Sequence, residues 1–105
     1  MDRPGYVIIL VVASVLGSCT AYDKALMTRL EPGPAGEWRY VAAANGAFPE
    51  SSPRAEAFRL RWLDEIMRDN RACPAGYRIE GRRAVFKQRL LGADLHDVYY
   101  DVRCS

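Results

Sequence analysis

An apolar run at the extreme N-terminus constrains the fate of this chain more than any other feature. Residues 6–16 read YVIILVVASVL, in which Ser14 is the only strongly polar member. At 1.5 Å per residue, a helix of this length reaches about 16 Å, roughly half of a bilayer's hydrocarbon core. The run is too short to span a membrane stably, but its length and position match the apolar region of a secretory signal peptide. A buried strand is the alternative, because residues 7–12 are continuously aliphatic and mostly β-branched.

The residues that end this run carry a resemblance. Leu16-Gly17-Ser18-Cys19 resembles the lipobox of bacterial lipoproteins, in which an aliphatic residue and two small residues precede a cysteine. The resemblance implies that residues 1–18 are a signal peptide, that cleavage occurs before Cys19, and that Cys19 is acylated, with chains such as palmitate. Thr20, rather than aspartate, follows the cysteine, which implies the periplasmic face of the outer membrane if the organism is Gram-negative. Two or more acyl chains hold a protein on a bilayer essentially permanently.

The remaining cysteines predict a disulfide. Three cysteines are present, and lipidation of Cys19 would leave Cys73 and Cys104 as a pair. Export would deliver this pair to an oxidising compartment, in which a disulfide persists. Closing a loop of about 30 residues stabilises a fold by about 3–4 kcal/mol on the chain-entropy model, which is a large amount for a chain this short. Two free thiols in a cytosolic protein are the alternative. A metal site is disfavoured, because two sulfurs and the single His96 do not make a closed tetrahedral set.

Size and charge exclude several classes of protein. A chain of 105 residues forms one domain at most, and its hydrophobic content of 50% is too high for disorder throughout. A net charge of +2 argues against a polybasic nucleic-acid-binding protein. The chain is also too small for a large enzyme with a deep cleft. We therefore expect a small globular domain behind the N-terminal segment.

The first half of that domain shows one strand and one helix. Residues 19–36 end in a stretch rich in proline and glycine and predict a tether, with one helical turn at most around Leu26 and Leu30. Over residues 38–42, which read WRYVA, one set of side chains at 38, 40 and 42 alternates with a second set at 39 and 41, and this pattern predicts a strand. Ser52-Pro53 is a typical helix start, and apolar residues then recur at helical spacing until about Arg71. Arg59 lies close to this apolar stripe, and we expect its stem to pack while its head reaches water. The aromatic residues expected in the core are Trp38, Tyr40, Phe58 and Trp62.

The second half predicts two strands joined as a hairpin, over residues 77–88 and 95–104. The earlier of these loses its alternation at Gly81-Arg82-Arg83, where a β-bulge would restore it. The predicted fold class is α+β: a small two-layer domain over residues 37–105, in which one helix packs on a three-stranded, mainly antiparallel sheet. Its order along the chain is strand-helix-strand-strand. We expect the last strand to lie centrally, paired with the first, and the arginine-rich strand to lie at an edge.

The same sequence shows little catalytic chemistry. His96 is the only histidine; Asp94 and Asp97 could orient it, but a lone histidine at a strand start is more often a surface residue. We expect no catalytic residue, no metal and no cofactor. A basic cluster lies within twelve residues: Arg78, Arg82, Arg83, Lys87 and Arg89. It could meet anionic lipid head groups or an acidic protein, and the alternative, which we favour, is a solvated edge that discourages stray pairing.

The functional expectation follows from the anchor. We expect a non-enzymatic envelope lipoprotein, attached to membrane lipid through acylated Cys19, that acts as an adaptor or assembly accessory for another envelope component. The alternative is a periplasmic module that binds a soluble ligand or inhibits an enzyme. No nucleic acid is expected as a partner, and the sequence does not identify a small-molecule ligand.

Overall fold

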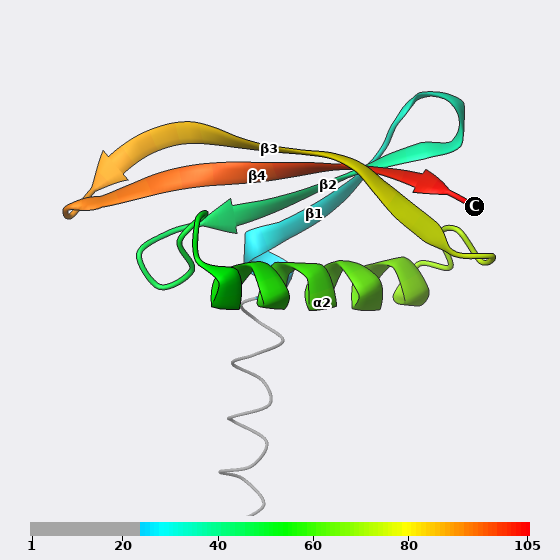
Figure 1. The fold of residues 1–105 in the computed structure, drawn as a ribbon, viewed down its shortest axis with the longest axis horizontal. Helices are drawn as coiled ribbons and strands as arrows, with labels where there is room; N and C mark the ends of the chain where they lie inside the picture. Colours follow the sequence, from blue (N-terminus) through cyan, green and yellow to red (C-terminus); the bar gives the residue numbers. More distant parts are fainter. Residues whose placement is uncertain (1–23) are drawn as a thin grey trace, which may run out of the picture.

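The computed structural model describes residues 24–105, which form one four-stranded antiparallel sheet with one long helix on one of its faces (Figure 1). Residues 24–27 are helical. The elements that follow are β1 (Thr28–Pro32), the 3₁₀ turn η1 (Pro34–Gly36), β2 (Glu37–Ala44), α2 (Pro53–Asp69), β3 (Tyr77–Leu90) and β4 (Ala93–Cys104). In space the strands run β1-β2-β4-β3. Within residues 24–105 no helix is both long and apolar enough to cross a membrane.

The α+β class is therefore confirmed, but the expected three-stranded sheet and its strand-helix-strand-strand order are wrong. Residues 28–32, for which the sequence predicts a tether, form β1, so two strands precede α2. The pairing runs from Thr28 opposite Ala42 to Pro32 opposite Trp38. The proline- and glycine-rich stretch is a tight reversal between two strands and not the end of a tether. Positive φ angles at Ala35 (53°) and Gly36 (77°) turn the chain there.

The expected pairing of the other strands is confirmed. β4 lies between β2 and β3, and the arginine-rich β3 is an edge strand. The hairpin turn is shorter than expected, because β3 and β4 continue to Leu90 and Ala93 and leave only Leu91 and Gly92 between them. The ladder is irregular at two places, between Ile79 and Gly81 and between Phe86 and Gln88. The first irregularity lies beside the predicted bulge, whereas the second was not foreseen.

The helix begins where the sequence predicts. Ser52 Oγ accepts a hydrogen bond from the Ala55 amide at 3.2 Å, and Pro53 occupies the first turn, where its missing N–H has no partner to lose. α2 ends at Asp69, close to the expected end near Arg71. Its apolar stripe packs on the face of the sheet that β2 and β4 dominate. The residues buried most completely in this core are Tyr40, Ala42, Ala44, Leu63, Val98, Tyr100 and Val102.

The expected aromatic core is correct in part. Tyr40 and Trp62 are buried. Trp38 and Phe58 are only partly buried, and Phe58 joins Phe48 and Trp62 in an aromatic group beside the loop that precedes α2. The β3–β4 hairpin continues past the N-terminal end of α2 (Figure 1), so the residues near its turn are not covered by the helix. The end of this hairpin, residues 85–96 around the turn at Leu91 and Gly92, is called the arm.

Candidate functional site

The Cys73–Cys104 pair joins the end of the helical layer to the sheet. The structure brings the two cysteines to disulfide distance, with their Cα atoms 4.9 Å apart. Cys73 lies in the turn after α2, and Cys104 lies opposite Tyr77, the first residue of β3. This is the arrangement that the sequence predicts. A cavity of about 360 Å³ lies beside the pair, lined by Met67, Arg68, Ala72, Pro74, Gly76 and Tyr77 among others.

The predicted basic cluster does not form a continuous basic patch. Its residues do not share one face of β3, since Arg82 lies opposite Tyr100 and Arg83 opposite the adjacent Tyr99. Four of the five lie against carboxylates: Arg78 with Glu80 at 3.4 Å, Arg82 with Glu56 at 3.0 Å, Lys87 with Asp97 at 3.2 Å and Arg89 with Asp94 at 3.6 Å. The fifth, Arg83, stacks over the Tyr99 ring at 4.9 Å. Most of its positive charge is therefore compensated within the domain.

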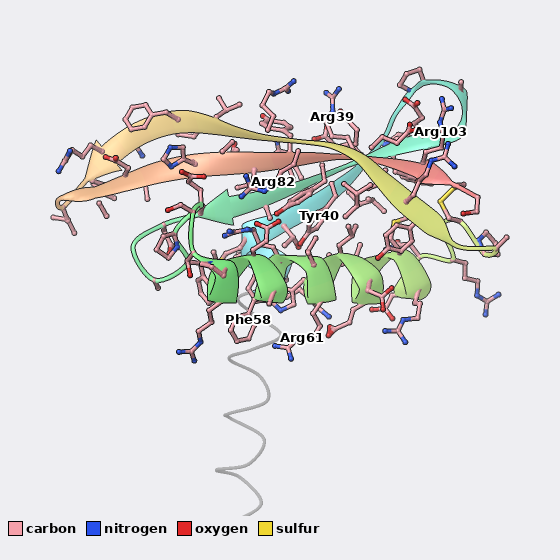
Figure 2. The ribbon with its side chains drawn as sticks, in the orientation of Figure 1. Arg39, Tyr40, Phe58, Arg61, Arg82 and Arg103 are labelled. Carbon is pink, nitrogen blue, oxygen red and sulfur yellow. A yellow bond between two sulfur atoms is a disulfide. The ribbon has the colours of Figure 1, made fainter. Side chains whose placement is uncertain are left out.

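One member of the cluster, Arg82, bonds toward the helix although its side chain remains 36% exposed. Arg82 points from β3 toward α2 (Figure 2), where its Nη2 donates to Glu56 Oε1 at 3.0 Å and to the carbonyl of Glu50 at 2.7 Å. Glu56 also accepts from Tyr100 Oη at 2.8 Å and from Arg59 Nη2 at 3.1 Å. A single carboxylate thus connects α2 with β3 and β4.

Arg59 corrects an expectation. Its side chain is 0% exposed, so its head does not reach water. Apart from Glu56, its guanidinium donates to three backbone carbonyls of the loop before α2, those of Phe48, Pro49 and Glu50. The backbone carbonyl of Arg59 itself accepts from Tyr40 Oη at 2.9 Å. Among the described residues no buried side-chain nitrogen or oxygen lacks a hydrogen-bond partner. This polar cluster is therefore a structural joint, which holds α2, the sheet and the loop before α2 together by hydrogen bonds.

The electrostatics of the cluster follow from these bonds. Burial by itself raises the pKa of Glu56, but hydrogen bonds from Arg82, Tyr100 and Arg59 outweigh it, and the pKa is lowered overall. Burial and the hydrogen bond to Glu56 raise the pKa of Tyr100. The hydrogen bond to Glu56 raises the pKa of Arg82, although partial burial opposes it. These shifts hold Glu56 ionised and Tyr100 protonated, which suits a structural joint better than proton transfer at neutral pH.

The arm that extends past α2 carries exposed apolar side chains. Phe86 is 56% exposed, Leu90 53% and Leu91 99%. Leu91 and Gly92 form the turn with φ angles of 52° and 80°, positive at both positions as a type I′ turn requires. A leucine in this conformation is unfavourable, since its Cβ crowds the backbone. A fully exposed leucine at a strained position contributes nothing to the domain's own core and suits contact with another molecule.

His96 lies on this arm and does not form a catalytic arrangement with its neighbours. Its ring stacks edge-on against Phe86, with 5.6 Å between ring centroids. The two carboxylates that could orient it pair elsewhere, Asp94 with Arg89 and Asp97 with Lys87. Over residues 24–105 no three His, Cys, Asp or Glu side chains are grouped to hold a metal ion.

The predicted lipid attachment at Cys19 and the signal peptide over residues 1–18 lie outside the described residues. Comparisons with protein-family models, with curated proteins and with solved structures found no match to this chain.

Two features of the candidate surfaces were missed from sequence. The apolar arm could have been suspected, because the run Arg89-Leu90-Leu91-Gly92 places two leucines at a hairpin turn, where polar residues are usual. In the Glu56 cluster only the spacing of Glu56 and Arg59, three residues apart, is local; Arg82 and Tyr100 lie 26 and 44 residues from Glu56 along the chain, which leaves no local signal for them.

Proposed function

We propose that this protein is a membrane-anchored bacterial envelope lipoprotein that acts, without catalysis, as an adaptor or assembly accessory for another envelope component. The observation that carries the proposal is Leu16-Gly17-Ser18-Cys19 directly behind an apolar run of signal-peptide length. Lipid attachment at Cys19 would leave Cys73 and Cys104 as the remaining pair, and their Cα atoms lie 4.9 Å apart, a distance that a disulfide can bridge.

The arm supports a role in binding a protein. An antiparallel hairpin that extends beyond its covering helix presents apolar side chains at low entropic cost, because its backbone is already held by ladder hydrogen bonds. Its exposed residues are Phe86, Leu90 and Leu91, with Lys87 and Arg89 beside them. Apolar side chains within a polar rim are typical of protein contact sites.

Lipidation is tested by comparing the full chain with its Cys19→Ala form. The native form is expected to incorporate labelled fatty acid, to be processed to a smaller size and to partition with membranes. The Cys19→Ala form is expected to show neither labelling nor processing. Equal labelling of the two forms would overturn the anchor.

The adaptor role is tested on the same lipidated protein. Cross-linked complexes recovered from membranes are expected to lose their partner when Phe86 and Leu91 are both changed to serine. Leu26→Ser is the matched control, since Leu26 is an exposed leucine, 66% accessible, away from the arm. Loss of the partner in the control, or its retention in the arm variant, would contradict the proposal.

A second candidate is a periplasmic module that binds a soluble ligand, and the cavity beside the Cys73–Cys104 pair favours it. Its volume of about 360 Å³ lies in the range of small-molecule sites. This candidate requires the Cys19→Ala protein to retain binding in solution, whereas an adaptor that acts on the membrane should lose its effect with its anchor.

A further inference from the structure

The outer face of α2 carries a line of arginines. Arg54, Arg61 and Arg68 are spaced by seven residues, so they lie on nearly the same side of the helix, about 10.5 Å apart along its axis. All three are exposed. Arg61 lies over the Phe58 ring at 4.8 Å, and Figure 2 shows both side chains on the side of α2 that faces away from the sheet.

Two carboxylates beside these arginines, Asp64 and Glu65, already have cationic partners. Asp64 Oδ2 lies 2.7 Å from Arg68 Nη2, and Glu65 Oε2 lies 3.1 Å from Lys24 Nζ. Within the described part of the chain, neither Arg54 nor Arg61 has a carboxylate within 4 Å. Two cations on this face therefore stay available for an anion outside the domain.

The chain enters the domain at this same face. The ion pair between Lys24 and Glu65 puts the first described residue on the helix surface one turn from both Arg61 and Arg68. Only five peptide steps separate Lys24 from Cys19, and a fully extended chain covers at most about 18 Å over that length. If Cys19 is held in a bilayer, as the proposed function requires, Lys24 and the adjoining part of α2 lie close to the lipid surface.

The other face of the domain is a poor alternative. Figure 2 shows Arg39 and Arg103 on the far side of the sheet, away from α2. Arg103 pairs there with Glu37 at 2.7 Å and with Glu80 at 3.3 Å, and Arg39 lies 3.9 Å from Asp101. Arg83, on the same face, stacks over the Tyr99 ring instead of pairing with a carboxylate. Most of this face's positive charge is compensated, and the sheet and the helix separate it from the entry point at Lys24.

We propose that α2 lies flat on an anionic phospholipid surface, with Arg54 and Arg61 at headgroup phosphates and Ala57 between them facing the lipid. This inference rests on the proposed lipid anchor and adds an orientation to it. A guanidinium forms paired hydrogen bonds to phosphate oxygens, and cations near an anionic membrane are attracted over about a Debye length. In this orientation the sheet's far face points to the periplasm and the arm extends alongside the membrane.

The test uses the full, processed chain purified from membranes and reconstituted into vesicles. Ala57→Cys supplies a free thiol for a polarity-sensitive dye, and Val85→Cys on the arm is the matched control position. Vesicles are made of phosphatidylcholine alone or with 30% phosphatidylglycerol. Mass spectrometry of Cys19 and flotation of the vesicles report the anchor separately.

The dye at position 57 is expected to shift to shorter wavelength when phosphatidylglycerol is present, and the dye at position 85 is not. Arg54→Gln with Arg61→Gln is expected to remove most of the shift, as is 0.5 M salt. Arg39→Gln with Arg83→Gln removes the same charge from the far face and is expected to leave the shift intact.

Three results would overturn the inference. The first is equal emission at position 57 in both vesicles while the protein is acylated and floats. The second is a shift that persists in the Arg54→Gln, Arg61→Gln form. The third is an unchanged dye emission in both vesicles, combined with an acidic protein that binds the native chain and does not bind the Arg54→Gln, Arg61→Gln form. α2 would then be a protein-binding face. An unacylated Cys19 would instead overturn the proposed function, and this orientation with it.

Discussion

Replacing Glu56 by glutamine tests whether one carboxylate holds the helix, the sheet and the preceding loop together. The substitution keeps the size of the side chain and an acceptor oxygen for Tyr100 Oη, which lies 2.8 Å away. It removes the negative charge beside Arg59, whose Nε and Nη2 lie 3.2 and 3.1 Å from Glu56 Oε1. It also breaks the ion pair with Arg82.

The expected loss in free energy of unfolding is about 3 kcal/mol. Removing one partner of a buried ion pair costs about 3–5 kcal/mol, because the other charge is left uncompensated. Arg59 is 0% exposed, which argues for the full cost, but it keeps three carbonyl acceptors. The Glu56 side chain is 25% exposed, so water near it can stabilise part of the charge that Arg59 keeps. The three remaining acceptors of Arg59 and the partial exposure of Glu56 both favour the low end of the range of about 3–5 kcal/mol.

Urea unfolding at neutral pH measures this loss, and Glu65→Gln is the matched control. Glu65 pairs with Lys24 near the surface, so its substitution is expected to cost less than about 1 kcal/mol. A loss for Glu56→Gln no larger than that of the control would refute the reasoning. Adding Arg59→Met to Glu56→Gln is expected to cost less than the sum of the two single changes, because the uncompensated charge disappears.

The difference in stability between the native protein and Glu56→Gln is expected to depend on pH. The pKa of Glu56 is lowered by folding from its ordinary value of 4.5, so its ionised form stabilises the fold fully above that value. This contribution is lost as pH falls through the lower, folded pKa. The difference in stability between the native protein and Glu56→Gln is therefore expected to be constant near neutrality and to shrink in acid. A difference that grows below pH 4.5 would contradict the assigned direction.

Three further outcomes follow from burial and backbone geometry. Changing Cys73 and Cys104 to serine together is expected to lower stability by about 3–4 kcal/mol; a native protein whose urea midpoint and gel mobility do not respond to a reductant would contradict this. Leu63→Ala empties a site with 0% exposure and is expected to cost about 2–5 kcal/mol. The exposed Leu26→Ala is expected to change stability by less than about 0.5 kcal/mol. Leu91 has a φ of 52°, at which asparagine is tolerated better than leucine. Leu91→Asn is therefore expected to raise stability by about 0.5–1 kcal/mol, and a lower urea midpoint would argue against strain at this turn.

The elements that the sequence predicted well are those with local causes. The start of α2 rests on Ser52 and Pro53, and the regular alternation of Val98, Tyr100 and Val102 places β4 at the centre of the sheet. The approach of Cys73 to Cys104 follows once β3 and β4 pair. The helix start and the alternation in β4 depend on spacing along one short segment, which is visible without a fold. The cysteines lie 31 residues apart, and their approach could be predicted because two strands joined as a hairpin return the chain to its starting end.

The errors arose where a neighbour in space decides the outcome. β1 is short and ends in Pro32, so its pattern alone favours a tether; its pairing with β2 makes it a strand. Arg59 looked like a side chain with a solvated head, yet carbonyls from the loop before α2 and the carboxylate of Glu56 enclose it. Arg82 looked like one of five surface cations, and the register of β3 turns it inward.

The sequence by itself therefore determined the class of the domain, its helix and the cysteine pair, and it predicts a lipid anchor at Cys19. The class and the helix follow from periodicity and capping, which act over a few residues, and the cysteine pair follows from the number of cysteines and the order of the strands. Only the tertiary structure decided which charges are free. It compensates four cations of β3 with carboxylates, and among residues 24–105 it gives Arg54 and Arg61 of α2 no carboxylate partner. Coulomb attraction depends on distance in space, and residues far apart in sequence come within reach of one another only after folding.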